Sequence, residues 1–295
     1  MEHLDLDLDL NIYLSEYDRF NKIIVYSFKR GQGGIGDLIK FFMYALFVCI
    51  KHKFKLYFLI EPPEIYPIHK YIRLKDKYKN MYTSDSAITN SNSKYIYIFD
   101  EYSIKDKDIQ EGIFYKIIPE TMYHVTDLFD KIKIKASELF EFSQDIKLNA
   151  QIYNNLEYIS IHLRLGDKYL ETDPHFVMVK NDTRTYNEEN LYKFIEDNSH
   201  KNIIFFCDNK SYKIKLKEKY NFIIITDYEI GHTSLSNTTE KQILDSVTEF
   251  YILSNSTKIY KASHSGFSIM ASKFNNIENH IYSLESLESK DSNDS

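Results

Sequence analysis

The sequence predicts an α/β protein with two Rossmann-like halves, each a parallel sheet covered by helices. Short, nearly continuous apolar segments alternate with segments of helical period along most of the 295 residues. This alternation starts again near residue 150, after a helical stretch. About 100–200 residues make one domain, so the length fits two halves. We therefore expect a half at 1–150 and another at 151–283, facing a cleft, with ligands at the carboxyl ends of strands.

The first half begins with a segment that fits neither period well. Residues 1–20 alternate Leu and Asp, and because Asp is a poor strand former, we interpret them as a loose arm. After the arm, the pattern predicts a strand at 22–28, a buried helix at 36–52, strands at 54–60 and 95–99, and helical structure from 121 to about 146.

The second half shows a more regular alternation. It predicts strands at 158–163, 202–207, 222–226, 258–261 and 280–283, and helices at 188–197, 211–219, 241–253 and 267–274. Residues 284–295 form a polar tail with nothing to bury.

Composition excludes several classes of protein. Hydrophobic residues at 43% and charged residues at 27% are typical of globular proteins. The longest apolar runs, 41–50 and 54–60, are shorter than the ~20 residues of a membrane-spanning helix, and the start lacks the features of a secretory signal. The two cysteines, Cys49 and Cys207, lie in apolar patterns and indicate neither a disulfide framework nor a metal cluster. We expect a cytoplasmic protein without a membrane span.

The charge balance argues against a nucleic-acid partner. The chain has 37 basic and 43 acidic side chains, a formal net charge of -6. The lysines at 213, 215, 217 and 219 are therefore interpreted as one solvated helix face. Only five of the basic residues are arginines, so an arginine at a strand end indicates that its planar geometry is needed.

A glycine-rich loop follows the first predicted strand. Four of the eight glycines lie within residues 29–37, where they allow sharp turns and close approach of a ligand. Gly31, Gly33 and Gly36 match G-x-G-x-x-G, with Glu61 ending the next strand, so an NAD(P)-binding oxidoreductase is one interpretation.

Two features of this loop oppose the dinucleotide interpretation. Lys29 and Arg30 separate the strand from the loop, and Asp37, in the first turn of the helix, would repel a pyrophosphate. The alternatives are a structural tight turn and a loop that faces a sugar or an acceptor.

Polar residues also follow two strands of the second half. His162 and Arg164 share one face of a strand end, Gly166 turns the chain, and Asp167 could hold Arg164 or a ligand hydroxyl. An arginine fork suits phosphate oxygens, although a surface ion pair would explain the same residues. Asp208 and Asn209 follow the next strand and could contact a base or ribose, or cap the next helix.

A serine-rich segment precedes the last predicted helix. Ser263, Ser265, Gly266, Phe267 and Ser268 lie where a strand passes into a helix N-terminus, a place suited to an anion, although a serine cap alone is the simpler alternative. The preceding helix carries Asp245, and we expect its inner face to lie beside this segment.

These motifs in this order resemble the fucosyltransferase superfamily, which includes the alpha-1,2-, alpha-1,6- and protein O-fucosyltransferases. The matching segments are the G-G-x-G-[ND] loop at Gly33, Gly34, Gly36 and Asp37, the H-x-R-x-G-D motif from His162 to Asp167, and Asp245 with the serines from Ser263 to Ser268. The resemblance covers residues 22 to about 275, as islands. Leu165 stands where the alpha-1,2 and alpha-1,6 branches often have a second arginine, and the loop is also similar to that of heptosyltransferases.

The resemblance implies a GT-B-like fold and an inverting transferase that moves fucose from GDP-fucose to a hydroxyl of a glycan or protein. By this resemblance Arg164 grips the diphosphate, His162 lines the same pocket, Asp208 and Asn209 meet the nucleoside, and the segment from Ser265 to Ser268 binds phosphate oxygens. Asp37 is the candidate base. The D-x-D pattern at Asp106 and Asp108 lies in a charged loop away from strand ends, so we expect no metal and no cofactor besides the donor.

Overall fold

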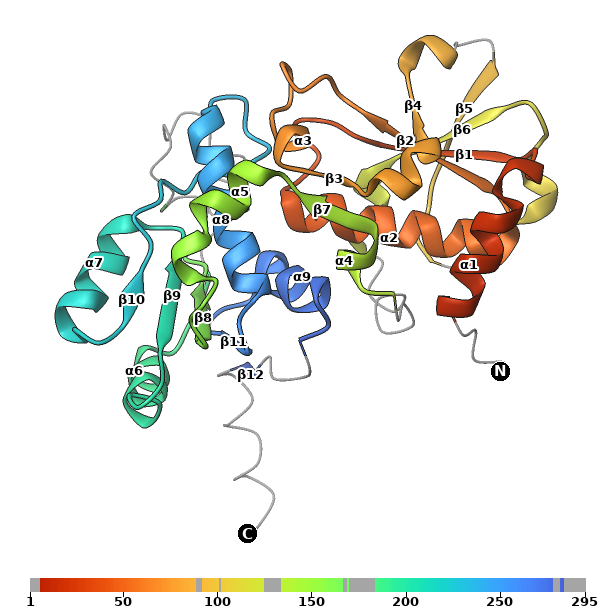
Figure 1. Ribbon diagram of the computed structural model, residues 1–295. Coiled ribbons are helices and arrows are strands. Elements are labelled where there is room, and N and C mark those ends of the chain that lie inside the picture. Colours follow the sequence, from red (N-terminus) through yellow and green to blue (C-terminus); the bar gives the residue numbers. More distant parts are fainter. Residues whose placement is uncertain are drawn as a thin grey trace. The chain divides into compact units, whose positions relative to one another are not determined.

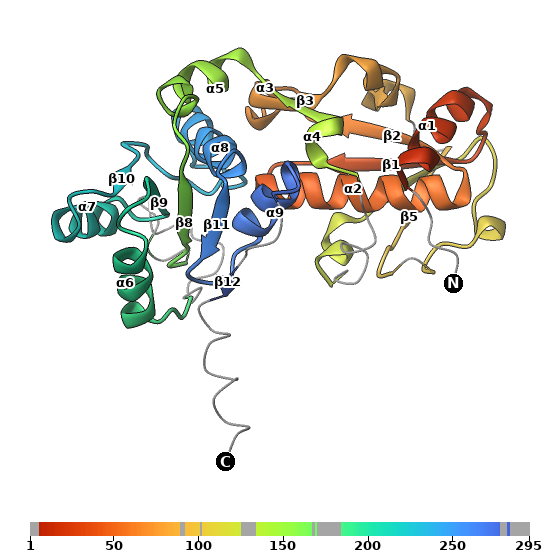
Figure 2. The same cartoon turned by 60° about the horizontal axis from the view of Figure 1, so that its bottom comes forward.

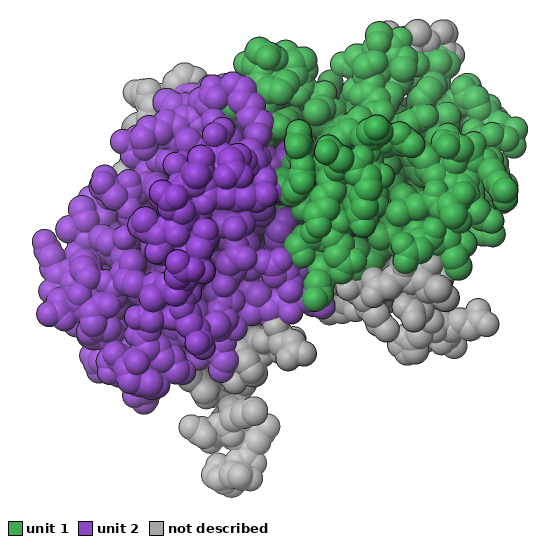
Figure 3. All heavy atoms as spheres, viewed as in Figure 1, with its two compact units in different colours: residues 1–33, 37–69, 73–141 green, residues 34–36, 70–72, 142–295 purple. Residues whose placement is uncertain are grey.

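The computed structural model describes residues 6–88, 92–100, 102–124, 134–166, 169, 184–277 and 282–283. The chain forms two compact units, each with its own sheet (Figure 3). Unit 1 contains residues 1–33, 37–69 and 73–141, and unit 2 contains residues 34–36, 70–72 and 142–295. Across the described ranges, every helix is too short or too polar to traverse a lipid bilayer.

The sheet of unit 1 has five parallel strands in the order β4-β2-β1-β6-β5 (Figure 1). Their bounds are β1 Ile23–Phe28, β2 Lys55–Ile60, β4 Tyr82–Thr83, β5 Ser93–Ile96 and β6 Phe114–Ile117. The order reverses beside β1, because β2 lies on one side of it and β6 on the other. Such a reversal is where α/β sheets bind ligands.

Helix α2 (Ile35–His52) packs against one face of this sheet (Figure 2). The hydroxyl of Tyr26 donates to the carbonyl oxygen of Leu38 at 3.0 Å, and the Phe42 ring packs against Tyr26 and Phe58. Alternate residues of β1 point to the opposite face, where Val25 joins Leu59 and Ile88 in a small cluster.

The N-terminal segment is a packed helix, so the prediction of a loose arm was wrong. Helix α1 covers Leu6–Glu16, and Tyr13 is buried. Its hydroxyl donates to the carbonyl oxygen of Phe54 at 2.8 Å and accepts from the amide of Leu56 at 3.0 Å. The Leu–Asp alternation hid the helical period, because Tyr13, which anchors the helix, comes after the alternating residues.

The region from 121 to 146 is not the continuous helical stretch that the sequence predicted. Among the described residues it contains α4 (Ala136–Leu139), β7 (Phe140–Phe142) and α5 (Gln144–Asn149), after a 3-10 turn at Pro119–His124. β7 pairs with β3 (Ile72–Leu74), which follows α3 (Ile68–Tyr71). The sequence also missed β6, because its apolar run is interrupted by Lys116.

Unit 2 has a second parallel sheet in the order β10-β9-β8-β11-β12. The strands are β8 Ile159–Leu163, β9 Ile203–Cys207, β10 Ile224–Ile225, β11 Lys258–Lys261 and β12 Tyr282–Ser283, all close to their predicted ranges. Here the strand order reverses beside β8, between β9 and β11.

Helices cover both faces of this second sheet. On one face α6 (Glu188–Asp197) and α7 (Lys210–Lys219) bury Leu191 and Leu216 against Ile161 and Phe205. On the other face α8 (Glu240–Ser254) and α9 (Gly266–Phe274) bring Phe250 and Phe267 together in an edge-to-face contact. Each unit contains one buried cysteine, Cys49 in α2 and Cys207 at the end of β9.

The lysines of α7 do not form one solvated face, which corrects that prediction. Lys213 is fully buried, with its ammonium 3.0 Å from the Glu249 carboxylate and 3.0 Å from the Thr226 hydroxyl. Lys217 donates to the carbonyl oxygen of Asn221 at 2.6 Å, beyond the helix end. Lys215 and Lys219 are exposed, as expected.

Candidate functional site

Arg164 lies at the strand-order reversal of unit 2, directly after β8. Its main chain is bound on both sides by Ser263, which follows β11: the Ser263 hydroxyl accepts from the Arg164 amide and donates to the Arg164 carbonyl oxygen, each at 2.8 Å. Ser263 is buried, and the two hydrogen bonds are partly buried. Its hydroxyl therefore positions the main chain of Arg164.

Asp208 fixes the same loop from the other side. Its two carboxylate oxygens accept from the amides of Leu165 and Gly166 at 2.8 and 3.0 Å, and Oδ2 lies 3.0 Å from Nη1 of Arg164. The carboxylate is buried, whereas the arginine side chain is 16% exposed. Asp208 is thus a partner of the Arg164 guanidinium, a pairing that the sequence analysis did not predict. Asp167 lies outside the described residues.

His162 lies on β8 beside this loop and is held neutral. Burial and the positive charge of Arg164 lower the pKa of His162 to about 3. Its ring stacks on Phe267 of α9, with ring centres 5.3 Å apart. Nδ1 is buried and has no hydrogen-bond partner among the described residues. The uncharged imidazole therefore packs between β8 and α9.

The N-terminus of α9 follows β11 and is capped by Ser265, whose hydroxyl accepts from the Phe267 amide at 3.3 Å. Gly266 is exposed, and the first turn, which is described in full, contains no acidic side chain. These features suit an anion. The hydroxyl of Ser268, in contrast, is buried and donates to the carbonyl oxygen of Ser265 at 3.2 Å, so it faces the protein and not a ligand.

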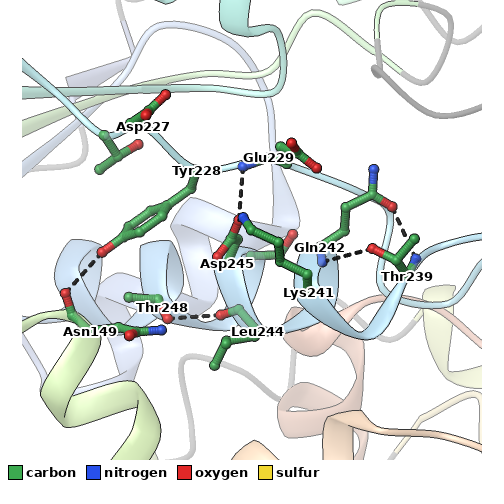
Figure 4. A network of polar contacts seen from close by, with 12 residues as sticks. Asn149, Asp227, Tyr228, Glu229, Thr239, Lys241, Gln242, Leu244, Asp245 and Thr248 are labelled. Carbon is green, nitrogen blue, oxygen red and sulfur yellow. Dashed lines mark hydrogen bonds and ion pairs between the residues drawn. The ribbon is translucent and has the colours of Figure 1, made fainter.

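Asp245 anchors the loop that enters α8 (Figure 4). Its Oδ2 accepts from the Glu229 amide at 3.0 Å and forms an ion pair with Lys241 at 2.5 Å. Asp245 is 3% exposed, and it contacts the loop at Glu229 and the first turn of α8 at Lys241. The helix itself packs against α9 through Phe250 and Phe267, as expected of its inner face.

Asn209 caps helix α7, which is one of the two roles that the sequence left open for it. Its side-chain oxygen accepts from the Tyr212 amide at 2.9 Å and caps α7. The amide nitrogen donates to the carbonyl oxygen of Tyr169 at 2.9 Å. Both ends of the side chain are therefore engaged within unit 2.

The glycine loop requires glycine at specific positions. Gly31 and Gly33 have φ values of +96° and +117°, which other residues rarely adopt. A Cβ on Gly33 would lie 2.6 Å from Oδ2 of Asp37 and 2.7 Å from the Tyr123 hydroxyl, so these side chains pack directly over the glycine. Asp37 and Tyr123 therefore leave no room for a side chain at position 33.

Residues 34–36 of the loop belong to unit 2. A Cβ on Gly36 would lie 3.0 Å from the main-chain oxygen of Gly266, and a Cβ on Gly34 would lie 3.6 Å from the Thr233 hydroxyl. Gly36 is therefore needed for close main-chain approach, whereas Gly34 has room.

The dinucleotide interpretation is weakened by Glu61. In dinucleotide-binding folds the acidic residue at the end of the second strand binds the ribose. Here the Glu61 carboxylate accepts from the Arg30 amide at 2.8 Å, so it already supports the loop.

Sequence reasoning missed a cavity in unit 1. It has a volume of about 210 Å³ and lies at the carboxyl ends of β1, β2 and β6, lined by residues that include Ser27, Lys29, Gln32, Asp85, Tyr95 and Lys116. The signal that could have found it is the lysine within the apolar run of β6. Within the described ranges, no group of three or more His, Cys, Asp or Glu side chains is arranged to hold a metal ion.

Two parallel-sheet units, each with polar residues where its strand order reverses, define a GT-B-like α/β protein. The chain shares the fold of two solved fucosyltransferases, which confirms the GT-B-like fold class predicted from the sequence. It is similar to a mutant of Arabidopsis thaliana FUT1 in complex with GDP, with a TM-score of 0.50, 11% identity and coverage of 92% of this chain and 74% of that one.

A second similar structure is the Bradyrhizobium NodZ alpha-1,6-fucosyltransferase soaked with GDP-fucose. The TM-score is 0.51 with 9% identity, and the likeness covers 86% of this chain and 92% of that one. No family model matches the chain, and no curated protein matches it in sequence.

Proposed function

We propose that this protein is a glycosyltransferase that moves fucose from GDP-fucose to a hydroxyl of a glycan or protein acceptor, with inversion and without a metal. The observation that carries the proposal is the fixation of Arg164 at the strand-order reversal of unit 2, by Ser263 through the main chain and by Asp208 through the guanidinium. The GDP and GDP-fucose complexes of the two similar structures support the choice of donor.

The donor diphosphate is expected to bind where β8 and β11 end. A guanidinium has several N–H donors in a planar fork, so it can hold Asp208 and phosphate oxygens together. The amides at the N-terminus of α9 follow β11 and carry a partial positive charge. Both groups are positioned before a ligand arrives, which avoids the cost of organising them during the reaction.

In the proposed reaction, an acceptor hydroxyl oxygen attacks the anomeric carbon as the bond from that carbon to the diphosphate oxygen breaks. The bonding electrons leave with GDP, so negative charge grows on the diphosphate. The growth of this charge is the main contribution to the activation barrier when no metal is present. Arg164 and the α9 amides lower the barrier by stabilising the charge. His162 is buried and remains neutral at physiological pH, so it does not add charge.

The proton of the acceptor hydroxyl needs a base, and we propose Asp37. It is half-buried in the first turn of α2, beside Gly33. A carboxylate base suits removal of a hydroxyl proton as the new bond forms.

The proposal is tested by thermal denaturation with a panel of nucleotides. GDP and GDP-fucose should raise the melting temperature by mass action, whereas NAD should have no effect. A larger shift with another nucleotide sugar, such as an ADP-heptose, would assign a different donor within the same fold. Stabilisation by NAD alone would overturn the proposal.

A further inference from the structure

The cavity of unit 1 combines three features that point to a ligand. It lies on the sheet face opposite α2, because Ser27, Leu59, Lys116 and Tyr95 are in register with Val25 or two residues from it, and paired residues point to the same face. All the residues that line it belong to unit 1.

The first feature is a buried hydroxyl without a partner. Ser27 is 8% exposed, and its Oγ has no hydrogen-bond partner among the described residues. Buried polar groups in folded proteins are nearly always hydrogen-bonded, so a lining hydroxyl without a partner indicates a ligand that supplies one.

The second feature is the positive charge of the lining. Lys116 is half-buried on β6, and Lys29 is exposed at the end of β1. Neither ammonium forms an ion pair with a carboxylate of the described residues. The one acidic lining residue, Asp85, is exposed, so the inner end of the cavity favours an anion.

The third feature is a row of exposed aromatic rings that leads away from the cavity. Tyr95, on the edge strand β5, lines it and is 69% exposed, and Tyr97 and Phe99, each 55% exposed, follow at alternate positions after the end of that strand. The Tyr97 and Phe99 rings are stacked with an interplanar angle of 1°. Exposed aromatic rings beside a polar cavity suit the apolar faces of a saccharide.

From these features we propose that the cavity binds an acidic sugar residue of the acceptor, with its anionic group at Lys116 and Lys29 and the rest of the glycan along Tyr95, Tyr97 and Phe99. A volume of about 210 Å³ suits one sugar ring and is below the ~300–1,000 Å³ of sites for larger ligands. Gln32 and Ser27 supply hydrogen bonds to hydroxyls of that ring. This inference rests on the proposed function, because it names the acceptor class of the same enzyme.

The test measures binding of tetragalacturonate, maltotetraose and inorganic phosphate to the full chain by titration calorimetry. Tetragalacturonate should bind at least tenfold more tightly than maltotetraose, and phosphate should bind weakly or not at all. Equal binding of the two saccharides would overturn the anionic preference, and binding of phosphate as tight as that of tetragalacturonate would reduce the site to one for a free anion.

Two variants and one matched control test whether the saccharide binds at this cavity. Lys116→Gln should weaken tetragalacturonate binding about tenfold by removing a charge-assisted contact, and Tyr95→Ala should weaken it by removing the exposed ring. Lys94→Gln, on the opposite face of neighbouring β5, should leave binding unchanged. Unchanged binding in both Lys116→Gln and Tyr95→Ala would overturn the inference.

GDP stabilisation of the same proteins separates this inference from the proposed function. Lys116→Gln and Tyr95→Ala should keep the full GDP-induced shift in melting temperature. A protein that binds GDP without preferring the acidic saccharide would contradict the inference alone. A protein that binds the saccharide but not GDP would support this site and contradict the proposed transferase.

Discussion

The hydroxyl of Ser263 binds both main-chain polar groups of Arg164, accepting from its amide and donating to its carbonyl oxygen, each at 2.8 Å. One side chain therefore fixes the loop after β8 to the loop after β11, where the strand order of unit 2 reverses. The two hydrogen bonds to Ser263 and the ion pair with Asp208 together position the guanidinium.

Ser263→Ala should lower the free energy of unfolding by about 1–3 kcal/mol, because the partly buried amide and carbonyl of Arg164 both lose their partner. It should also weaken GDP binding, since the main chain of Arg164 loses both hydrogen bonds to Ser263. Urea denaturation and a GDP titration measure the two effects. Ser263→Thr keeps the hydroxyl and should restore both, and Ser256→Ala, another buried serine of unit 2, should leave GDP binding unchanged. If Ser263→Ala bound GDP normally, the hydrogen bonds between Ser263 and Arg164 would have no part in donor binding.

Arg164→Lys should keep a positive charge near Asp208 but lose the planar fork, so GDP affinity should fall about tenfold or more. The protein should remain folded, because the Asp208 carboxylate still accepts from the amides of Leu165 and Gly166. The GDP-dependent shift in melting temperature measures the loss. Arg73→Lys, at an exposed ion pair of unit 1, is the matched control. GDP binding at the wild-type level in Arg164→Lys would rule out the assigned role.

His162 should make the protein less stable in mild acid. Its pKa is about 3 in the folded chain, against 6.5 for an unperturbed imidazole, so the unfolded chain takes up the proton first as the pH falls. The contribution of the neutral ring to the free energy of unfolding is complete above pH ~6.5. It is lost progressively towards pH ~3, and the loss reaches about 1.4 kcal/mol at pH ~5.5.

The variant His162→Phe tests this dependence because it keeps the stack on Phe267 without a titrating group. Urea denaturation across this pH range should give a flatter curve for His162→Phe than for the wild type. His69, whose pKa is about 4 because of burial, contributes equally to both curves and cancels in the difference. Parallel curves would show that His162 is already protonated or is not buried.

Tyr13→Phe tests the packing of α1. The change removes the hydroxyl that bridges the Phe54 carbonyl oxygen and the Leu56 amide, at the start of β2. We expect the free energy of unfolding to fall by about 1–3 kcal/mol. Tyr102→Phe, at an exposed ring, should change it by less than about 0.5 kcal/mol. Equal stability of the two variants would mean that the helix contributes little.

The sequence predicted the elements whose period is unambiguous. β8, α6 and β11 lie within a residue of their predicted ranges, because each combines a clear apolar period with polar residues at its ends. The same reasoning placed Arg164 and Ser263 at strand ends. It could not identify Asp208 as the partner of Arg164, because that pairing depends on which strands are neighbours in the sheet.

Two other errors have the same physical origin. Lys213 was predicted to be solvated because lysine usually is, but Glu249 and Thr226 of other elements supply its partners. The segment 121–146 was predicted to be helical from its period, but β7 is drawn into a pair with β3. In both cases a tertiary contact overrode the local signal.

The two cysteines give each unit a separate reporter of its opening. Cys49 and Cys207 are 0% and 1% exposed, and burial raises the pKa of both thiols. A thiol reagent can therefore modify Cys49 only when unit 1 opens and Cys207 only when unit 2 opens. Mass spectrometry of the two peptides during timed labelling would follow the opening of each unit in one sample, without introducing a probe, and would show which unit GDP protects.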